Sequence, residues 1–369
     1  MRGLVRFLLV LILISSTVGS SALLPTALPA KTLQIQANDR FSPNQHSLDI
    51  LSYDSKDDFI FTPQDIDLQD DAFHGSDSYH FLEWWYFDAL LNDGYSVKVS
   101  IQVLSIIDRY FAFSTIDVYR YGTFIKRERE TYPFSTFHAS ERVPLITVDG
   151  EKILHGCIDN GSNALRYRLS LSIKDLAIDL SFIGCTQGWK GKTTASWWGV
   201  ILPKAKVNGT IRVDNKDISV QGIGYHDHNW EVTVLSSLNF GWIWGKMNSA
   251  NYTFTYSSIL NTCFLDQQLL VINTQDTGYV SVHPDQFDFS IDEFQIRNGM
   301  VIPESFTLTA HEDSITLYAK MQVSDTHHTR LFGMINYWRY HIRCNGYITN
   351  GVHTESIDEI QIAEFIRFR

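Results

Sequence analysis

The chain has 369 residues, of which 13% are aromatic and 19% charged, and its formal net charge is −11. That length exceeds one ordinary core and fits two domains of about 130–170 residues. The composition excludes global disorder, because so many aromatic side chains can bury much apolar area. The acidic balance argues against a nucleic-acid partner and against electrostatic docking on anionic lipid, since both need a basic surface.

Residues 1–20 have the pattern of a secretory signal peptide. Arg2 and Arg6 precede an uninterrupted apolar run, Phe7–Ile14, and small residues follow it. The run is short for a bilayer span, so we expect cleavage, with an uncleaved signal anchor as the alternative. The mature chain is therefore expected to be secreted or extracytoplasmic, either soluble or in peripheral contact with a membrane.

Residues 21–74 are interpreted as an acidic, solvated leader. Prolines interrupt this stretch repeatedly, and the aspartates between positions 57 and 71 make it acidic. These aspartates lack the close Asp-x-Asp-x-Asp-Gly spacing of a calcium loop. Ordered structure is expected to begin near Tyr79.

Alternating segments dominate the rest of the chain. In Tyr95–Ile107 apolar side chains alternate with polar ones, and similar segments recur as far as Cys344. Asn-Gly and Asp-Gly pairs, which are favoured two-residue hairpin turns, separate them. Only Ile357–Phe365 has a helix-like pattern, and it also fits a strand. These features predict an all-β, antiparallel fold.

The segment Tyr79–Asp88 is aromatic on both faces of the expected strand. Glu83, Trp85 and Phe87 would share one face, and Trp84, Tyr86 and Asp88 the other, so both faces should be covered. A buried Glu83 needs hydrogen-bond partners or a raised pKa. It would be either a structural acceptor of N–H groups or a neutral acid.

The segment Gln221–Glu231 concentrates hydrogen-bonding and proton-transfer groups. In a strand, His226, His228 and Trp230 would share one face, while Asp227 and both its odd-numbered neighbours would share the other. Three interpretations are open. The cluster could line a cavity, could only fix the strand, or could bind a metal if a third ligand joined the two histidines.

A second aromatic group contains Trp242 and Trp244, which share a strand face between glycines, and Trp198 lies in an earlier Trp-Trp-Gly motif. Core packing is the ordinary role of such side chains. The alternative is an aromatic-lined pocket for an apolar or polyene ligand, whose π faces would stabilise a developing carbocation.

As a set, these motifs resemble the carotenoid 1,2-hydratase (hydroxyneurosporene synthase) family. Their order and spacing match over roughly residues 75–262. The matching motifs are Glu83-Trp84-Trp85-Tyr86-Phe87-Asp88, Trp197-Trp198-Gly199, Gly222–Trp230 and Trp242-Ile243-Trp244-Gly245. The resemblance implies two lipocalin-like antiparallel β-barrel domains, placed here at residues 75–235 and 236–369, with a ligand cavity near their interface. It implies no metal and no organic cofactor.

In that family an acid protonates a terminal isoprenoid double bond, aromatic faces stabilise the tertiary cation, and water captures it. The resemblance implies catalytic roles for His228, Trp230 and Tyr256. The family's carboxylate after the tyrosine is replaced by Ser258, whose hydroxyl is too weak an acid to protonate an alkene. Another acid would then have to act, or the chemistry differs. The remaining catalytic candidates are His226, Asp227 and Glu83, and the candidate ligand contacts are Trp85, Trp198, Trp242 and Trp244.

Two classes of function therefore stay open. One is a hydro-lyase or a pericyclase-like cyclase that hydrates or cyclises an isoprenoid or polyene. The other is a non-catalytic lipocalin-like carrier of an apolar ligand, a lipid included. The sequence leaves the ligand, the oligomeric state and the pairing of the four cysteines open.

Overall fold

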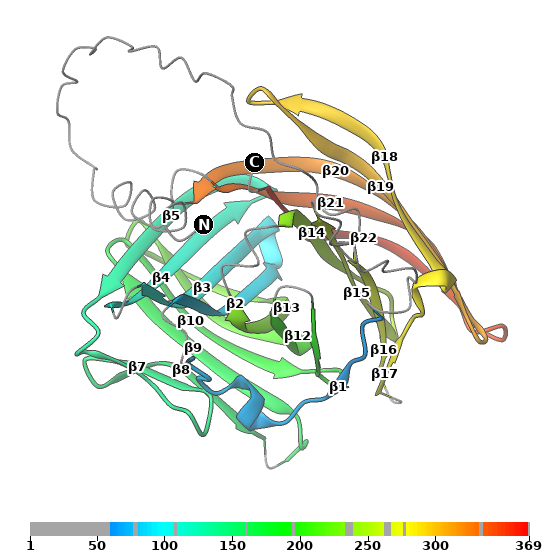
Figure 1. Cartoon of the computed structure of the whole chain (residues 1–369). Coiled ribbons are helices and arrows are strands. Elements are labelled where there is room, and N and C mark those ends of the chain that lie inside the picture. The colour runs from blue at the N-terminus through cyan, green and yellow to red at the C-terminus, as the bar shows by residue number, and fades with distance from the viewer. Residues whose placement is uncertain are drawn as a thin grey trace, which may run out of the picture. The chain divides into compact units, whose positions relative to one another are not determined.

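A computed structural model describes residues 60–76, 80–106, 109–159, 161–193, 196–232, 239–261, 267–275, 278–331 and 335–367. Residues Ile60–Arg369 form one compact unit. The expected signal peptide and residues 21–59 of the expected leader lie outside the described residues, so secretion stays a prediction. Most described residues belong to two antiparallel sheets, which we call sheet A and sheet B (Figure 1).

Sheet A precedes sheet B in the chain. Its strands are β1 (Gln64–Asp65), β2 (His80–Leu91), β3 (Tyr95–Ile106), β4 (Arg109–Arg120), β5 (Thr123–Tyr132), β6 (Phe137–Ala139), β7 (Leu145–Val148), β8 (Glu151–Ile158), β9 (Leu165–Ile173), β10 (Leu176–Gly184), β11 (Trp189–Lys192), β12 (Trp197–Val213) and β13 (Lys216–Val232). Their order is β5-β4-β3-β2-β13-β12-β10-β9-β8-β7-β6, and β11 pairs with both β1 and β12.

Sheet B contains β14 (Asn239–Asn248), β15 (Tyr252–Asn261), β16 (Gln267–Thr274), β17 (Gly278–Ser281), β18 (Phe287–Arg297), β19 (Met300–Glu312), β20 (Ile315–Leu331), β21 (Ile335–Thr349) and β22 (Thr354–Arg367). Their order is β17-β16-β15-β14-β22-β21-β20-β19-β18. The short 3₁₀ segments are η2 (Leu68–Asp71), η3 (Asn92–Gly94) and η5 (Pro284–Gln286).

The prediction of an all-β, antiparallel, lipocalin-like fold is confirmed, with two sheets of which one is nearly a barrel. Sheet A curls almost into a barrel (Figure 1), and an ion pair of 2.9 Å joins Lys174 Nζ, in the β9–β10 turn, to Glu128 Oε2 on β5. An Asn-Gly hairpin turn forms as expected at Asn298 and Gly299, whose φ values of 52° and 76° suit a two-residue turn between twisted strands. The turns expected at Asn208-Gly209 and Asn345-Gly346 are wrong, because these pairs lie inside β12 and β21. The stretch with a helix-like pattern is part of β22.

Three groups of buried side chains hold the two sheets. The sheet A core lies inside the curl of sheet A and contains Trp85 and Phe87. The sheet B core contains Tyr256 and Trp338. The third group joins strands of both sheets, and we call it the intersheet cluster. It consists of Phe61, Tyr86, Trp189, Trp198, Val200, Tyr225, Trp244, Leu269 and Val271, with Trp84, Trp242 and Tyr279 packed against it.

Strands β2 and β13 lie side by side between these groups. Their register pairs Trp85 with His228 and Tyr86 with Asp227. Because directly opposite residues of antiparallel strands share a face, Trp85 and His228 point into the sheet A core, while Tyr86 and Asp227 point toward sheet B. The predicted division of faces is confirmed for both strands, and so is the covering of β2 on both sides.

The segment 60–76 corrects the prediction of a solvated leader. Phe61, Asp71 and Ala72 are buried, and β1 pairs with β11. Gly191 on β11 permits the close approach, because a Cβ atom there would lie 2.2 Å from the Phe61 ring. The acidic composition was misleading because the partners that bury Asp71 come from β13, far away in the sequence.

Candidate functional site between the two sheets

The centre of the intersheet cluster is formed by residues of four strands, and its other members come from β11, β16 and the segment before β1. Trp198 comes from β12, Tyr225 from β13, Tyr86 from β2 and Trp244 from β14. The Tyr225 ring stacks on Trp244 with centroids 5.3 Å apart, and Tyr86 and Trp198 meet Trp244 edge-on at 5.5 and 6.3 Å. Trp244 therefore has aromatic neighbours from three strands of sheet A.

Asp227 lies beside this aromatic group and is 3% exposed. Tyr225 Oη donates to its Oδ2 at 2.9 Å, and Asn229 Nδ2 donates to its Oδ1 at 3.2 Å. Burial raises the pKa of Asp227 to about 8, although hydrogen bonds from Tyr225 and Trp198 act in the opposite direction. The carboxylates of Glu364 and Asp88 add to the rise. Asp227 is thus a protonated carboxyl at neutral pH.

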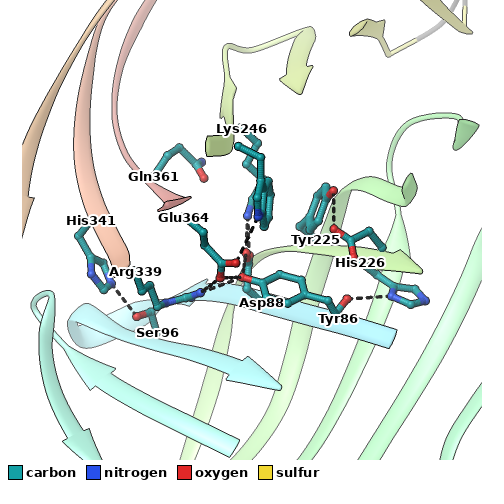
Figure 2. Close-up of polar contacts among 12 residues, drawn as sticks. Tyr86, Asp88, Ser96, Tyr225, His226, Lys246, Arg339, His341, Gln361 and Glu364 are labelled. Carbon is teal, nitrogen blue, oxygen red and sulfur yellow. Dashed lines mark hydrogen bonds and ion pairs between the residues drawn. The ribbon is translucent and has the colours of Figure 1, made fainter. Parts of the chain in front are cut away.

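Beside Asp227 and the aromatic group, buried charged side chains of the two sheets contact one another, and we call them the ionic layer (Figure 2). Lys246 Nζ on β14 lies 2.6 Å from both carboxylate oxygens of Asp88 on β2. Burial lowers the pKa of Lys246, against the opposing charge of Asp88. Glu364 on β22 accepts from Tyr86 Oη at 2.7 Å and from Arg339 Nη1 at 3.0 Å. The layer therefore joins residues far apart in sequence.

The same layer extends toward β4 and β5. Arg127 donates two hydrogen bonds to Asp117, of 2.5 and 2.6 Å, and reaches Thr329 Oγ1 on β20 at 2.9 Å. Ser96 Oγ and His341 Nε2 are 3.0 Å apart, and burial lowers the pKa of His341 to about 3, so this imidazole is neutral (Figure 2). Polar pairs thus join the two sheets at β3 and β5 of sheet A and at β20 and β21 of sheet B.

The predicted histidine pair lies in the sheet A core. His228 Nε2 is 2.9 Å from Glu83 Oε1, and its Nδ1 is 3.3 Å from Asp71 Oδ1. Burial alone would lower the pKa of His228, but hydrogen bonds and charges of Asp71 and Glu83 raise it to about 9. His228 is therefore a buried imidazolium between two carboxylates.

Glu83 and His226 belong to the same buried group of ionisable side chains as His228 and Asp71. Glu83 also accepts from the backbone N–H groups of His74 and Gly75, each at 2.9 Å, which favours its structural interpretation. His226 Nδ1 donates to the Tyr86 carbonyl at 2.9 Å, and its Nε2 lies 3.0 Å from Asp71 Oδ2. Burial would raise the pKa of Asp71, but the two histidines lower it to about 2. All four ionisable side chains are 0% exposed.

Trp85 and Trp230 flank His228. Trp85 stacks on its ring at 4.6 Å and donates Nε1–H to the Asp71 carbonyl at 3.0 Å. Trp230 meets His228 at 5.2 Å and stacks on His74 at 4.2 Å. These contacts tie the segment 60–76 to β2 and β13, and they leave the histidines without access to solvent.

Tyr256 lies apart from both groups. On β15 it faces the sheet B core, where its ring packs 5.1 Å from Phe289, and Ser258 shares this face. Burial raises the pKa of Tyr256 well above its ordinary value. The family motif therefore does not bring Tyr256 together with His228 or Asp227 here.

The four predicted ligand contacts divide between two places. Trp85 is in the sheet A core, Trp198 and Trp244 are in the intersheet cluster, and Trp242 packs at its margin. Two hollows in the described part of the chain lie elsewhere. One, of about 220 Å³, is lined by Phe73, Val103, Phe134, Phe137, His138 and Ala139. The other, of about 470 Å³, lies near Tyr318 and Tyr347.

Sequence reasoning missed Asp71, Lys246, Arg339 and Glu364. The period-two pattern of β14 and β22 could have indicated two of them, because Lys246 and Glu364 are charged residues within otherwise apolar strands. Nothing local indicated Asp71, since it lies among other aspartates.

Other expectations concern metals, membranes and cysteines. Within the described ranges, no group of three or more His, Cys, Asp or Glu side chains could hold a metal ion. In the same residues no helix has the length and apolar character needed to cross a membrane. Cys157, Cys185 and Cys344 have free thiols, and Cys263 lies outside the described residues.

The fold and the intersheet site define a two-sheet, lipocalin-like protein, and comparison with known proteins makes this class more specific. No protein-family model matches the chain. It is 21% identical over 343 residues to a hydroxyneurosporene dehydrogenase of Chlorobaculum tepidum, covering 80% of this chain and 85% of that protein.

Solved structures show the same fold. The crystal structure of an AttH protein from Nitrosomonas europaea matches with a TM-score of 0.61 and 14% identity, over 83% of this chain and 98% of that one. CghA crystallised with Sch210972 matches with a TM-score of 0.54 and 9% identity, over 79% and 89%. The resemblance to the carotenoid hydratase-like and AttH-like lipocalin-like family is therefore confirmed.

Proposed function

We propose that this protein is an enzyme that holds an apolar, unsaturated small molecule, an isoprenoid or a polyene, at the intersheet cluster and uses Asp227 as its acid. The observation that supports this function is the buried carboxyl of Asp227, whose pKa of about 8 keeps it protonated at neutral pH. A carboxylic acid kept neutral by its surroundings is typical of catalytic sites. The similarity to a hydroxyneurosporene dehydrogenase agrees with such a substrate.

The partners of Asp227 leave its proton available. Tyr225, Asn229 and Trp198 all donate to this carboxyl, and neither the amide N–H of Asn229 nor the indole N–H of Trp198 can accept its O–H. The acidic proton can therefore pass to a bound molecule. Trp244 and Tyr225 supply aromatic faces next to it, which attract a developing positive charge.

Hydration would proceed in two balanced steps. The proton leaves the Asp227 carboxyl and bonds to the less substituted carbon of a double bond, whose π electrons form the new C–H bond. Water then bonds to the resulting cation and loses a proton to the Asp227 carboxylate, which restores the acid. A cyclisation would begin with the same proton transfer. A second double bond of the substrate then bonds to the cation, and the new cation loses a proton to the Asp227 carboxylate.

Access to Asp227 is expected at the margin of the cluster. Asp227 itself is nearly covered, whereas Trp84 and Trp242 are only partly buried. We expect the substrate to enter between these two indoles and to displace side-chain contacts as it binds. The substitutions Trp84→Ala and Trp242→Ala should therefore weaken ligand binding.

The test is turnover of terminal isoprenoids and conjugated polyenes in ¹⁸O-labelled water, followed by mass spectrometry of the products. The wild-type chain should form a hydrated or cyclised product, and Asp227→Asn should lower kcat about 10²–10⁴-fold with binding retained. Asp217→Asn, on the exposed part of the same strand, is the matched control and should leave turnover unchanged.

The carrier is distinguished in the same experiment. Ligand binding by the wild-type chain without any product would contradict the enzyme and support a lipocalin-like carrier. Equal turnover by wild type and Asp227→Asn would contradict the role of Asp227.

A further inference from the structure

The far half of the β18–β19 hairpin separates from sheet B. The pairing of β19 with β20 covers Ser305–Glu312, whereas the pairing of β18 with β19 continues to the turn at Asn298-Gly299. Residues Phe294–Pro303 therefore form a two-stranded ribbon, which diverges from β20 (Figure 1). We call this stretch the distal ribbon.

The distal ribbon exposes large apolar side chains on one face. Ile296 is 76% exposed, Phe294 57% and Val301 50%. Ile296 and Val301 are directly opposite in the register, and Phe294 precedes Ile296 by two residues, so all three point the same way. Single exposed apolar residues are ordinary, but three that share one face of a ribbon separated from its sheet indicate an interaction surface.

Three arginines lie in or near the distal ribbon, although the whole chain is acidic and Glu304 directly follows the ribbon. Arg297 is the one charged residue between Phe294 and Pro303. Strand alternation places it on the face opposite Ile296, where its Nε donates to Gln295 Oε1 at 2.6 Å. Arg367 Nη1 donates to the Val301 carbonyl at 3.4 Å. Asn336 on β21 lies opposite Arg330 on β20 and opposite Arg367 on β22. Arg330 is therefore two strands from Arg367 at the same level of sheet B. The hairpin acids Asp292 and Glu293 lie where the ribbon leaves the sheet, and Asp292 accepts from Thr307 Oγ1 at 2.6 Å.

We propose that the distal ribbon docks the protein on the surface of an anionic lipid bilayer. Phe294, Ile296 and Val301 would enter the boundary between headgroups and acyl chains, where apolar side chains gain by leaving water. The arginines would meet the headgroup phosphates, to which basic residues are attracted at short range. This docking does not depend on the chemistry of Asp227, but it would bring the intersheet cluster to a medium that dissolves isoprenoids.

The test compares two variants with the same chemical change. Val301→Asp places a charge on the distal ribbon, and Val352→Asp places it on the β21–β22 turn, where Val352 is 81% exposed. Each full-length variant is sedimented with vesicles of phosphatidylcholine and phosphatidylglycerol, and with phosphatidylcholine alone. We expect Val301→Asp to lower the bound fraction on anionic vesicles roughly tenfold and Val352→Asp to leave it unchanged.

Hydrogen exchange makes the result specific to the site, because residues 1–20 could also bind lipid and are present in both variants. Backbone amides of residues 294–303 should become protected on anionic vesicles, while those of 345–356 should not. Protection elsewhere, with residues 294–303 unprotected, would overturn the proposal. Protection of residues 294–303 without lipid, growing with protein concentration, would also overturn it and assign the ribbon to a second copy of the chain.

Discussion

Asp227 and His228 are neighbours on one strand, yet opposite physical effects govern their pKa values. Burial is the cause that raises the pKa of Asp227, so its neutral form is favoured. His228 is also buried, but two carboxylates raise its pKa and favour its charged form. The alternation of a strand thus places a neutral acid toward sheet B and an imidazolium inside sheet A.

Asp227 should make the folded chain less stable as pH rises. Between the ordinary carboxyl pKa of 3.8 and about 8, the unfolded chain loses a proton that the folded chain keeps, so the free energy of unfolding falls across this interval. Asp227→Asn removes this dependence. Its Tm relative to wild type should therefore rise from pH 5 to pH 8, measured by calorimetry. The control Asp217→Asn removes an exposed carboxylate that pairs with Arg212 and should show no such trend. A constant difference for Asp227→Asn would contradict its raised pKa.

His228 should stabilise the fold most at acidic and neutral pH. Its pKa is raised from 6.5 to about 9, so its contribution is complete below pH 6.5 and disappears as pH rises through 9. His228→Gln leaves Glu83 and Asp71 without their shared cation, and should cost about 3–5 kcal/mol at pH 6. Urea unfolding at pH 6 and pH 9 checks this. The exposed His311→Gln is the control, and a cost independent of pH would argue against a buried imidazolium.

At the scale of elements, period-two alternation predicted the faces of β2 and β13 but not their partners. Which side of a strand holds Trp85 or His228 depends only on residue parity. Which strand lies next to it depends on tertiary pairing. That pairing determines that Asp71 is buried and that Tyr256 lies away from Asp227. Asp71 is buried because His226 and His228 receive it, and Tyr256 is separated from Asp227 because even-numbered residues of β15 face the sheet B core.

The segment 60–76 offers the sharpest test of an element that composition mispredicted. Phe61 is 3% exposed and packs on Trp189 at 5.6 Å, whereas its neighbour Ile60 is 39% exposed. Phe61→Ala should lower the free energy of unfolding by about 3–4 kcal/mol, and Ile60→Ala by less than about 0.5 kcal/mol. Chemical denaturation of both variants measures this difference. Equal small costs would mean that the segment is a solvated leader after all.

At the scale of the molecule, the two sheets are joined by aromatic packing together with buried charges. Charges placed between sheets cost desolvation, so their net contribution to stability is small, but each is strongly destabilising when its partner is removed. Asp88 on sheet A and Lys246 on sheet B form such a pair, and both are nearly inaccessible to solvent. The sequence showed both charges but could not show that they meet, since 158 positions separate them.

A double-mutant cycle on this pair tests whether the sheets depend on each other through charge. Lys246→Met should cost about 3–5 kcal/mol, because it leaves Asp88 charged and buried, and Asp88→Asn should cost a similar amount. The double variant should cost clearly less than the sum of the two, with a coupling of about 2–3 kcal/mol in urea unfolding. The exposed pair Arg212–Asp217, within sheet A, is the matched control, and its coupling should stay below about 1 kcal/mol. If the Asp88–Lys246 coupling were equally small, this ion pair would have no measurable part in joining the two sheets, which would then be held by the intersheet cluster and by the other polar contacts between them.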